Sequence, residues 1–197
     1  MPVSLGGKGD WKNAFVNFEY HDHVKGWKEY FLVTMGYHVG GLIDHFFHER
    51  RSDFLEMTLH HFLALYLYGG AYMVNGWEGG GVIAFLHDIA DITGNLMKIL
   101  VETKFTNFTG ITFVGHMALW AYTRMYVLPI LIHGVWMWCP DMGSWWMKFI
   151  FTYMLSGMCF LHFYWFGIFI QMLNKYVTTG KTDDKQCELK SNKPKAN

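Results

Sequence analysis

Five apolar segments, each close to the length that crosses a bilayer, follow one another along this chain of 197 residues. A membrane-spanning helix needs about 20 predominantly apolar residues, and backbone groups in lipid must be satisfied inside a helix or a closed barrel. Only 16% of the residues are charged, well below the share of about 25% in soluble domains. The sequence therefore predicts an all-α integral membrane protein with five spans, at 30–47, 54–74, 82–100, 109–138 and 145–173.

The polar stretches outside these spans divide the chain into three regions. The first contains aromatic residues, Phe15 among them, which favour either an amphipathic helix at the membrane interface or an irregular tether. The last is rich in lysine. We expect an N-terminal polar arm at 1–29, one membrane domain at 30–173 and a polar C-terminal tail at 174–197.

Two local features predict breaks in the helices. The run NGWEGGG at 75–81 predicts a short turn built from helix breakers. Because this turn is short, the second and third spans are expected to be antiparallel neighbours. Pro129 predicts a kink in the fourth span, since proline cannot donate the backbone hydrogen bond to residue i−4.

The distribution of charge predicts an orientation in the membrane. Lysine and arginine residues near the spans gather on the face that holds 48–53, 101–108 and the tail. The positive-inside rule then places the C-terminus on the cytosolic or matrix side. The formal net charge is zero, so no nucleic-acid partner is expected. The three cysteines have the spacing of neither a disulfide framework nor a zinc motif.

Five ionisable side chains lie within the second and third spans, where a charge costs about 2.5–3.5 kcal/mol on insertion scales. His60 and His61 are neighbours, about 100° apart around one helix. On the next helix His87 and Asp91 are four residues apart, and Asp88 and Asp91 are three apart, so these three form one polar patch. We expect one interior pocket lined by His60, His61, His87, Asp88 and Asp91, with His38, Asp44, His45 and Arg124 as further pocket candidates.

This set of residues is compatible with three kinds of site. In acyl transfer, an imidazole accepts a proton from an amine or becomes acylated itself, while a carboxylate holds its tautomer. In a metal site, imidazoles and carboxylates bind iron, manganese or zinc. Membrane hydroxylases and desaturases use several HxxHH boxes, which this chain lacks, so no metal is expected. In a structural network, buried polar groups hydrogen-bond the helices together.

The histidine and aspartate pattern resembles the Lag1 motif of ceramide synthases, which belong to the TLC (TRAM-Lag1-CLN8) family. Here the motif is His60-His61 followed, after twenty-five residues, by HDIAD at 87–91. Three flanking segments are also similar to that family: RRSDFLEMTLHH at 50–61, TRMYVLPI at 123–130 and LHFYWFGIFIQML at 161–173. The resemblance covers about 30–181, which is most of the chain.

The resemblance implies a helical barrel around a lipid cavity, in the endoplasmic reticulum membrane. It implies transfer of a fatty acyl group from acyl-CoA, as co-substrate, to the amine of a sphingoid base. One of His60 and His61 would act as acyl acceptor or general base, and His87, Asp88 and Asp91 would complete a proton relay. No tightly bound cofactor is implied, whereas bound membrane lipid is.

The family's barrel has a further span before the first one found here, where only about thirty polar residues precede position 30. We therefore expect an N-terminally shortened, five-sided barrel with a gap beside 30–47. A helix from another membrane protein chain, or lipid, would fill this gap. An alternative function follows: a non-catalytic structural or lipid-binding subunit of a multi-subunit membrane complex, such as a respiratory or ATP-synthase assembly in the mitochondrial inner membrane.

Overall fold

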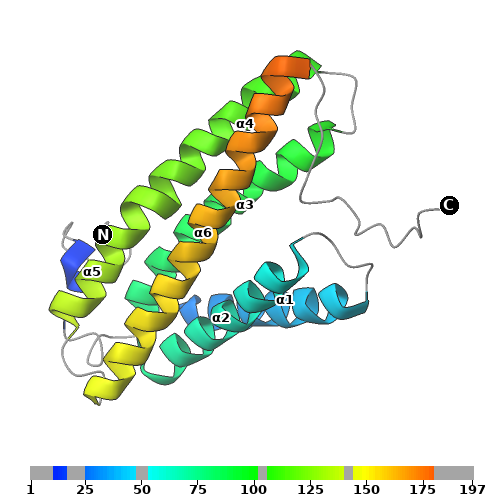
Figure 1. The fold of residues 1–197 in the computed structure, drawn as a ribbon. Coiled ribbons are helices and arrows are strands. Elements are labelled where there is room, and N and C mark those ends of the chain that lie inside the picture. Colours follow the sequence, from blue (N-terminus) through cyan, green and yellow to red (C-terminus); the bar gives the residue numbers. More distant parts are fainter. Residues whose placement is uncertain (1–10, 17–24, 48–52, 102–105, 140–143, 180–197) are drawn as a thin grey trace, which may run out of the picture.

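The computed structural model describes residues 11–16, 25–47, 53–101, 106–139 and 144–179, and these residues are almost entirely helical. No strand occurs in this part of the chain. A short 3₁₀ turn, η2 (Trp11–Ala14), precedes five long helical runs (Figure 1), which confirms the prediction of an all-α chain with five spans. The runs are α1 (Trp27–Phe47), α2 (Phe54–Met73), α3 (Trp77–Val101), the continuous α4 (Thr106–Trp120), η4 (Ala121–Val127) and α5 (Leu128–Trp138), and α6 (Trp145–Thr179).

The observed helices extend a few residues beyond several of the predicted spans, and most clearly at the end of α6, which continues to Thr179. Most of the tail, at 180–197, lies outside the described residues, as do 1–10 and 17–24 of the arm. The predicted loops are likewise described only at their edges. The orientation of the C-terminus in the membrane stays a prediction.

The turn between α2 and α3 is shorter than predicted, because α3 already begins at Trp77. Asn75 has a left-handed φ of 63°, and the N–H of Gly76 donates to the carbonyl of Ala71 at 2.8 Å. This left-handed residue followed by a six-to-one hydrogen bond is the Schellman ending of an α-helix. The prediction that all of 75–81 is a turn was therefore wrong.

Three consecutive glycines lie inside the first turns of α3 because aromatic rings occupy the space that side chains would fill. A Cβ on Gly79 would lie 2.8 Å from Cε1 of Phe15, and one on Gly80 would lie 3.0 Å from Cζ of Phe31. A Cβ on Gly81 would overlap the ring of Trp27. The glycines thus act as a cradle for the N-terminal arm and α1 rather than as helix breakers.

The fourth span changes its helical geometry before Pro129. Residues Ala121–Val127 form a π-helix, and the N–H of Leu128 donates to the carbonyl of Thr123, five residues earlier. A π segment rotates the side chains that follow it relative to an α-helix, and such segments occur frequently at functional sites. Here Thr123 and Arg124 are both buried. The irregularity therefore precedes the proline and sets the direction of the arginine.

The helices pack so that α2, α3, the α4–α5 run and α6 contact one another in a ring, while α1 packs against α2 and touches α3. Figure 1 shows α5 beside α6, with α1 and α2 together on the other side of α6. The last long helix, α6, packs on α2 and so joins the ring directly.

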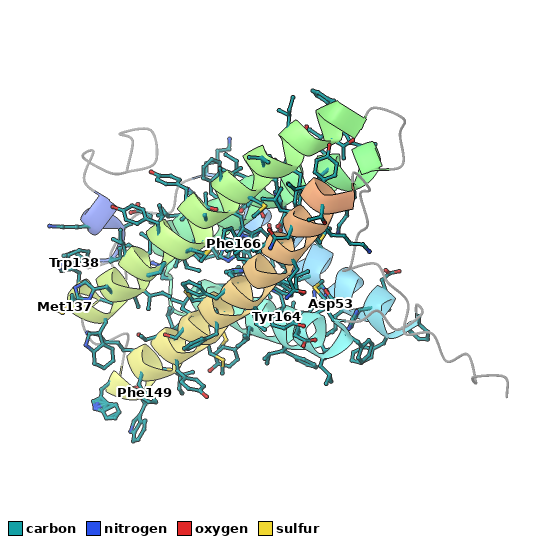
Figure 2. All side chains as sticks on the ribbon, turned by 45° about the horizontal axis from the view of Figure 1, so that its top comes forward. Asp53, Met137, Trp138, Phe149, Tyr164 and Phe166 are labelled. Carbon is teal, nitrogen blue, oxygen red and sulfur yellow. The ribbon has the colours of Figure 1, made fainter. Side chains whose placement is uncertain are left out.

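The outer faces of the helices are apolar. Val33, Phe47 and Phe160 are each more than two-thirds exposed, and Figure 2 shows Met137 and Phe149 at the surface of the bundle. Among the described residues one helix, α6, is long and apolar enough to cross a membrane, over Trp145–Thr178. Side chains buried between α2, α3, α4 and α6 form the main core.

Candidate functional site

The two aspartates of α3 have different partners. The Asp88 carboxylate accepts a hydrogen bond from the Tyr30 hydroxyl of α1 at 2.7 Å. The Asp91 carboxylate forms an ion pair with Arg124 of η4. Arg124 therefore pairs directly with Asp91, whereas the hydrogen-bond partner of Asp88 is a neutral hydroxyl. A carboxylate of this kind favours a cation, such as an ammonium group.

Arg124 is buried, with 2% of its surface exposed. Its guanidinium donates to the backbone carbonyl of His87 at 2.9 Å, as well as to Asp91. Its Cζ lies 3.9 Å from the centre of the Trp120 ring, which is a cation–π arrangement. The sequence predicted Arg124 as a pocket candidate. The structure instead places it behind the cavity, where it holds the α3 motif through both a side chain and a backbone group.

His87 is held from both sides. Its Nδ1 lies 2.7 Å from the carbonyl of Ile83, and its Nε2 lies 2.8 Å from Nε2 of His162 on α6. A carbonyl only accepts, so Nδ1 carries the proton; for neutral rings, Nε2 of His87 then accepts from Nε2–H of His162. Both nitrogens of His87 are therefore engaged within the protein, which leaves neither for a metal ion or for proton transfer to a ligand.

Sequence reasoning missed His162, whose side chain is fully buried. Its Nδ1 has no hydrogen-bond partner, and the Trp120 indole donates to its backbone carbonyl at 3.3 Å. The available signal was an ionisable residue in the middle of the most apolar span, where a polar group is costly and functional by default. Tyr30, the partner of Asp88, was also missed, because a tyrosine at the edge of a span is common at membrane interfaces.

His60 lines the cavity and has one nitrogen free of a strong partner. Its Nδ1 lies 3.1 Å from Sδ of Met158. A thioether sulfur can only accept, so Nδ1 carries the proton and Nε2 is the basic nitrogen of the neutral ring. His38 lies nearby, with ring centres 6.3 Å apart. His60 therefore combines access to the cavity with an unprotonated nitrogen.

His61 does not line the cavity, although it was expected to share the pocket with the other four motif residues. Its ring lies at the interface with α1, so that a Cβ on Gly41 would be 3.0 Å from its Cε1. The physical reason is the rotation of about 100° per helical residue, which turns His61 away once His60 faces inward. Four of the five motif residues do share the cavity: His60, His87, Asp88 and Asp91.

Asp44 and His45 also lie outside the cavity, whereas the third candidate of α1, His38, lines it. The Nε2 of His45 lies 2.9 Å from both the carbonyl of Phe54 and the hydroxyl of Thr58, so this histidine fastens α1 to the start of α2. Six or seven residues separate these two side chains from His38, or about 10 Å along the helix. They are too far along α1 to reach the pocket.

The cavity encloses about 1020 Å³ of empty space, including its open mouth. Its polar end contains the four motif residues above together with His38 and Tyr68, and its other end is apolar. Tyr37 and Asp91 both line the cavity and are exposed, so the polar end opens between α1 and α3. The expected gap beside 30–47, and its filling by lipid or by a helix of another chain, stay predictions.

Comparison with known proteins agrees with the resemblance to ceramide synthases seen in the sequence. The family model of the TLC domain, named for TRAM, LAG1 and CLN8, matches residues 8–171. Ceramide synthase 4 of Mus musculus is 29% identical over 163 residues, or 81% of this chain and 42% of that protein. Ceramide synthase hyl-2 of Caenorhabditis elegans is 27% identical over 183 residues, or 85% and 55%. Ceramide synthase 4 of Homo sapiens is 24% identical over 156 residues, or 78% and 40%. The chain spans about half the length of these curated relatives.

Proposed function

Because the chain belongs to the TLC-domain family, as an all-α membrane protein similar to ceramide synthases, we propose that it transfers a fatty acyl group from acyl-CoA to the amine of a sphingoid base. One observation carries this proposal. A single cavity joins an apolar end to a polar end that contains an imidazole, His60, and a carboxylate, Asp88, whose hydrogen-bond partner is a hydroxyl group.

In this reaction the amine nitrogen forms a bond to the thioester carbonyl carbon, and the bond from that carbon to the CoA sulfur breaks. Asp88 attracts the substrate as an ammonium ion, which loses one proton to water before attack. His60 Nε2 then takes the second amine proton and passes it to the departing thiolate, so that the products are an amide and free CoA. General base catalysis of this kind typically contributes 10²–10⁴-fold.

The remaining motif residues act by positioning. Arg124 holds Asp91 and the backbone of His87, and His162 fixes the ring of His87. These contacts set the rotation of α3 and hence the direction of Asp88. His61 supports His60 from the α1 side. We place the chain in the endoplasmic reticulum membrane on the resemblance to ceramide synthases, and co-fractionation with membranes of that organelle tests this.

The decisive experiment is acylation of a sphingoid base by the purified chain in lipid, followed by mass spectrometry of the amide. His60→Ala should abolish turnover, whereas His133→Ala, an exposed histidine of α5, should retain it as the matched control. Asp88→Asn should raise KM for the amine more than KM for acyl-CoA. Equal turnover by His60→Ala and the unmodified chain would remove His60 from the chemistry. Lipid binding without turnover in any preparation would favour the non-catalytic alternative.

A further inference from the structure

A segment of the N-terminal arm fills the apolar end of the cavity. Ala14 is the last residue of η2 and Phe15 follows it directly, and the two are 1% and 3% exposed. Both line the cavity, at the end opposite the motif residues. Figure 1 shows η2, in blue, beside α5, and the two residues pack in one buried cluster with Val135, Cys139 and Leu155. The arm thus contributes a wall to a cavity that is otherwise built by the long helices.

Phe15 is held in this place by a contact of its ring and by contacts of Lys12, three residues before it. Its ring lies against Gly79, where a Cβ would be 2.8 Å from Cε1. Its N–H donates to the carbonyl of Lys12 at 2.9 Å. The Lys12 ammonium lies 5.0 Å from the centre of the Trp138 ring, a cation–π contact that fastens the segment to α5. Because Gly79 has no side chain, the ring of Phe15 can pack directly against α3.

The distance from the polar end to this wall is comparable to the length of a lipid chain. Along α2 the residues that line the cavity run from His60 to Val74, which is about 21 Å at 1.5 Å per residue. Along α3 they run from Gly79 to Asp91, or about 18 Å. A hydrocarbon chain that has its reactive head at His60 and fills the cavity would therefore end at Phe15.

We propose that Phe15 is a specificity-determining residue that sets the maximum length of the hydrocarbon chain in the cavity. This inference rests on the site used in the proposed function, but it concerns binding rather than catalysis. Each buried methylene contributes about 0.8 kcal/mol, which is about fourfold in affinity. Affinity should therefore rise about fourfold per methylene until the chain end reaches Phe15, and then stop rising.

The test is equilibrium binding to the full chain in lipid nanodiscs. The probes are two series of saturated ligands with increasing chain length, namely primary alkylamines and fatty acyl-CoAs. We expect a cut-off length in at least one series. Phe15→Ala should move this cut-off to longer chains by at least two carbons, and Phe15→Leu should move it less in the same direction. Phe160→Ala, on the exposed face of α6, should leave it unchanged.

The outcomes separate this inference from the proposed function. A cut-off that moves with residue 15 upholds the role of Phe15 even where no acyl transfer is detected. An unchanged cut-off in both Phe15 variants overturns it, even where acyl transfer is observed. Because Phe15→Leu retains an apolar side chain in the buried cluster, it keeps the test decisive if Phe15→Ala fails to fold.

Discussion

Removing the charge of Asp91 should destabilise the protein more than removing its partner, Arg124. The pair is asymmetric, since 3% of the Arg124 side chain is exposed against 55% of the Asp91 side chain. In Asp91→Asn, a buried guanidinium loses its counter-ion and cannot reach water. In Arg124→Met, a carboxylate loses its counter-ion, but its side chain is half-exposed at the mouth of the cavity rather than enclosed by protein.

The magnitudes follow from these surroundings. Removing one partner of a buried ion pair costs about 3–5 kcal/mol, and we take about 3 kcal/mol for Asp91→Asn because asparagine retains a hydrogen-bond acceptor. Arg124→Met loses the cation–π contact with Trp120 and the hydrogen bond to the His87 carbonyl, and we take about 1 kcal/mol for both together because methionine keeps an apolar contact with the ring. For a chain of this size, each kcal/mol shifts Tm by about 2–4 °C. Asp91→Asn should therefore lower Tm by about 6–12 °C and Arg124→Met by about 2–4 °C.

These changes in Tm can be measured by thermal unfolding of the two single variants and the double variant in the same detergent. The double variant should be more stable than Asp91→Asn alone, because Met at position 124 removes the stranded charge. A coupling of about 2 kcal/mol is expected, within the range for residues in direct contact. Equal Tm losses in the two single variants, or losses that simply add in the double variant, would refute the burial argument.

Three further predictions follow from particular contacts. Gly80→Ala should lower Tm, since the added Cβ would lie 3.0 Å from the fully buried Phe31. Gly36 faces open space, so Gly36→Ala should leave stability unchanged or raise it by up to about 1 kcal/mol through helix propensity. A larger loss of Tm in Gly36→Ala than in Gly80→Ala would contradict the role of the glycines as a cradle. In ¹⁵N-histidine spectra, His87 should be the Nδ1–H tautomer and His162 the Nε2–H tautomer, and His162→Phe should shift the His87 signals; unaffected signals would exclude the contact. A C-terminal tag should be cleaved by protease added to the cytosolic side of sealed vesicles, and full protection there would reverse the orientation.

The sequence by itself determined the class of fold and the position of the α3 motif. Apolar length and low charge required helices, because lipid offers no hydrogen bonds to the backbone. The spacing of His87, Asp88 and Asp91 put them on one patch by local geometry alone, since residues three and four apart adjoin on any α-helix. The resemblance to ceramide synthases was also visible in the sequence, and the family is now established.

Only the tertiary structure decided which residues around the motif do what. His60 faces the cavity and His61 faces α1, a choice that depends on how α2 is rotated against its neighbours. His162 is brought to His87 by the packing of α6, across seventy-five residues of chain. The glycines of α3 predicted a turn from sequence, and only the aromatic rings that lie against them explain why they occur inside a helix. Each of these depends on side-chain packing between helices distant in sequence, which local periodicity and composition do not encode.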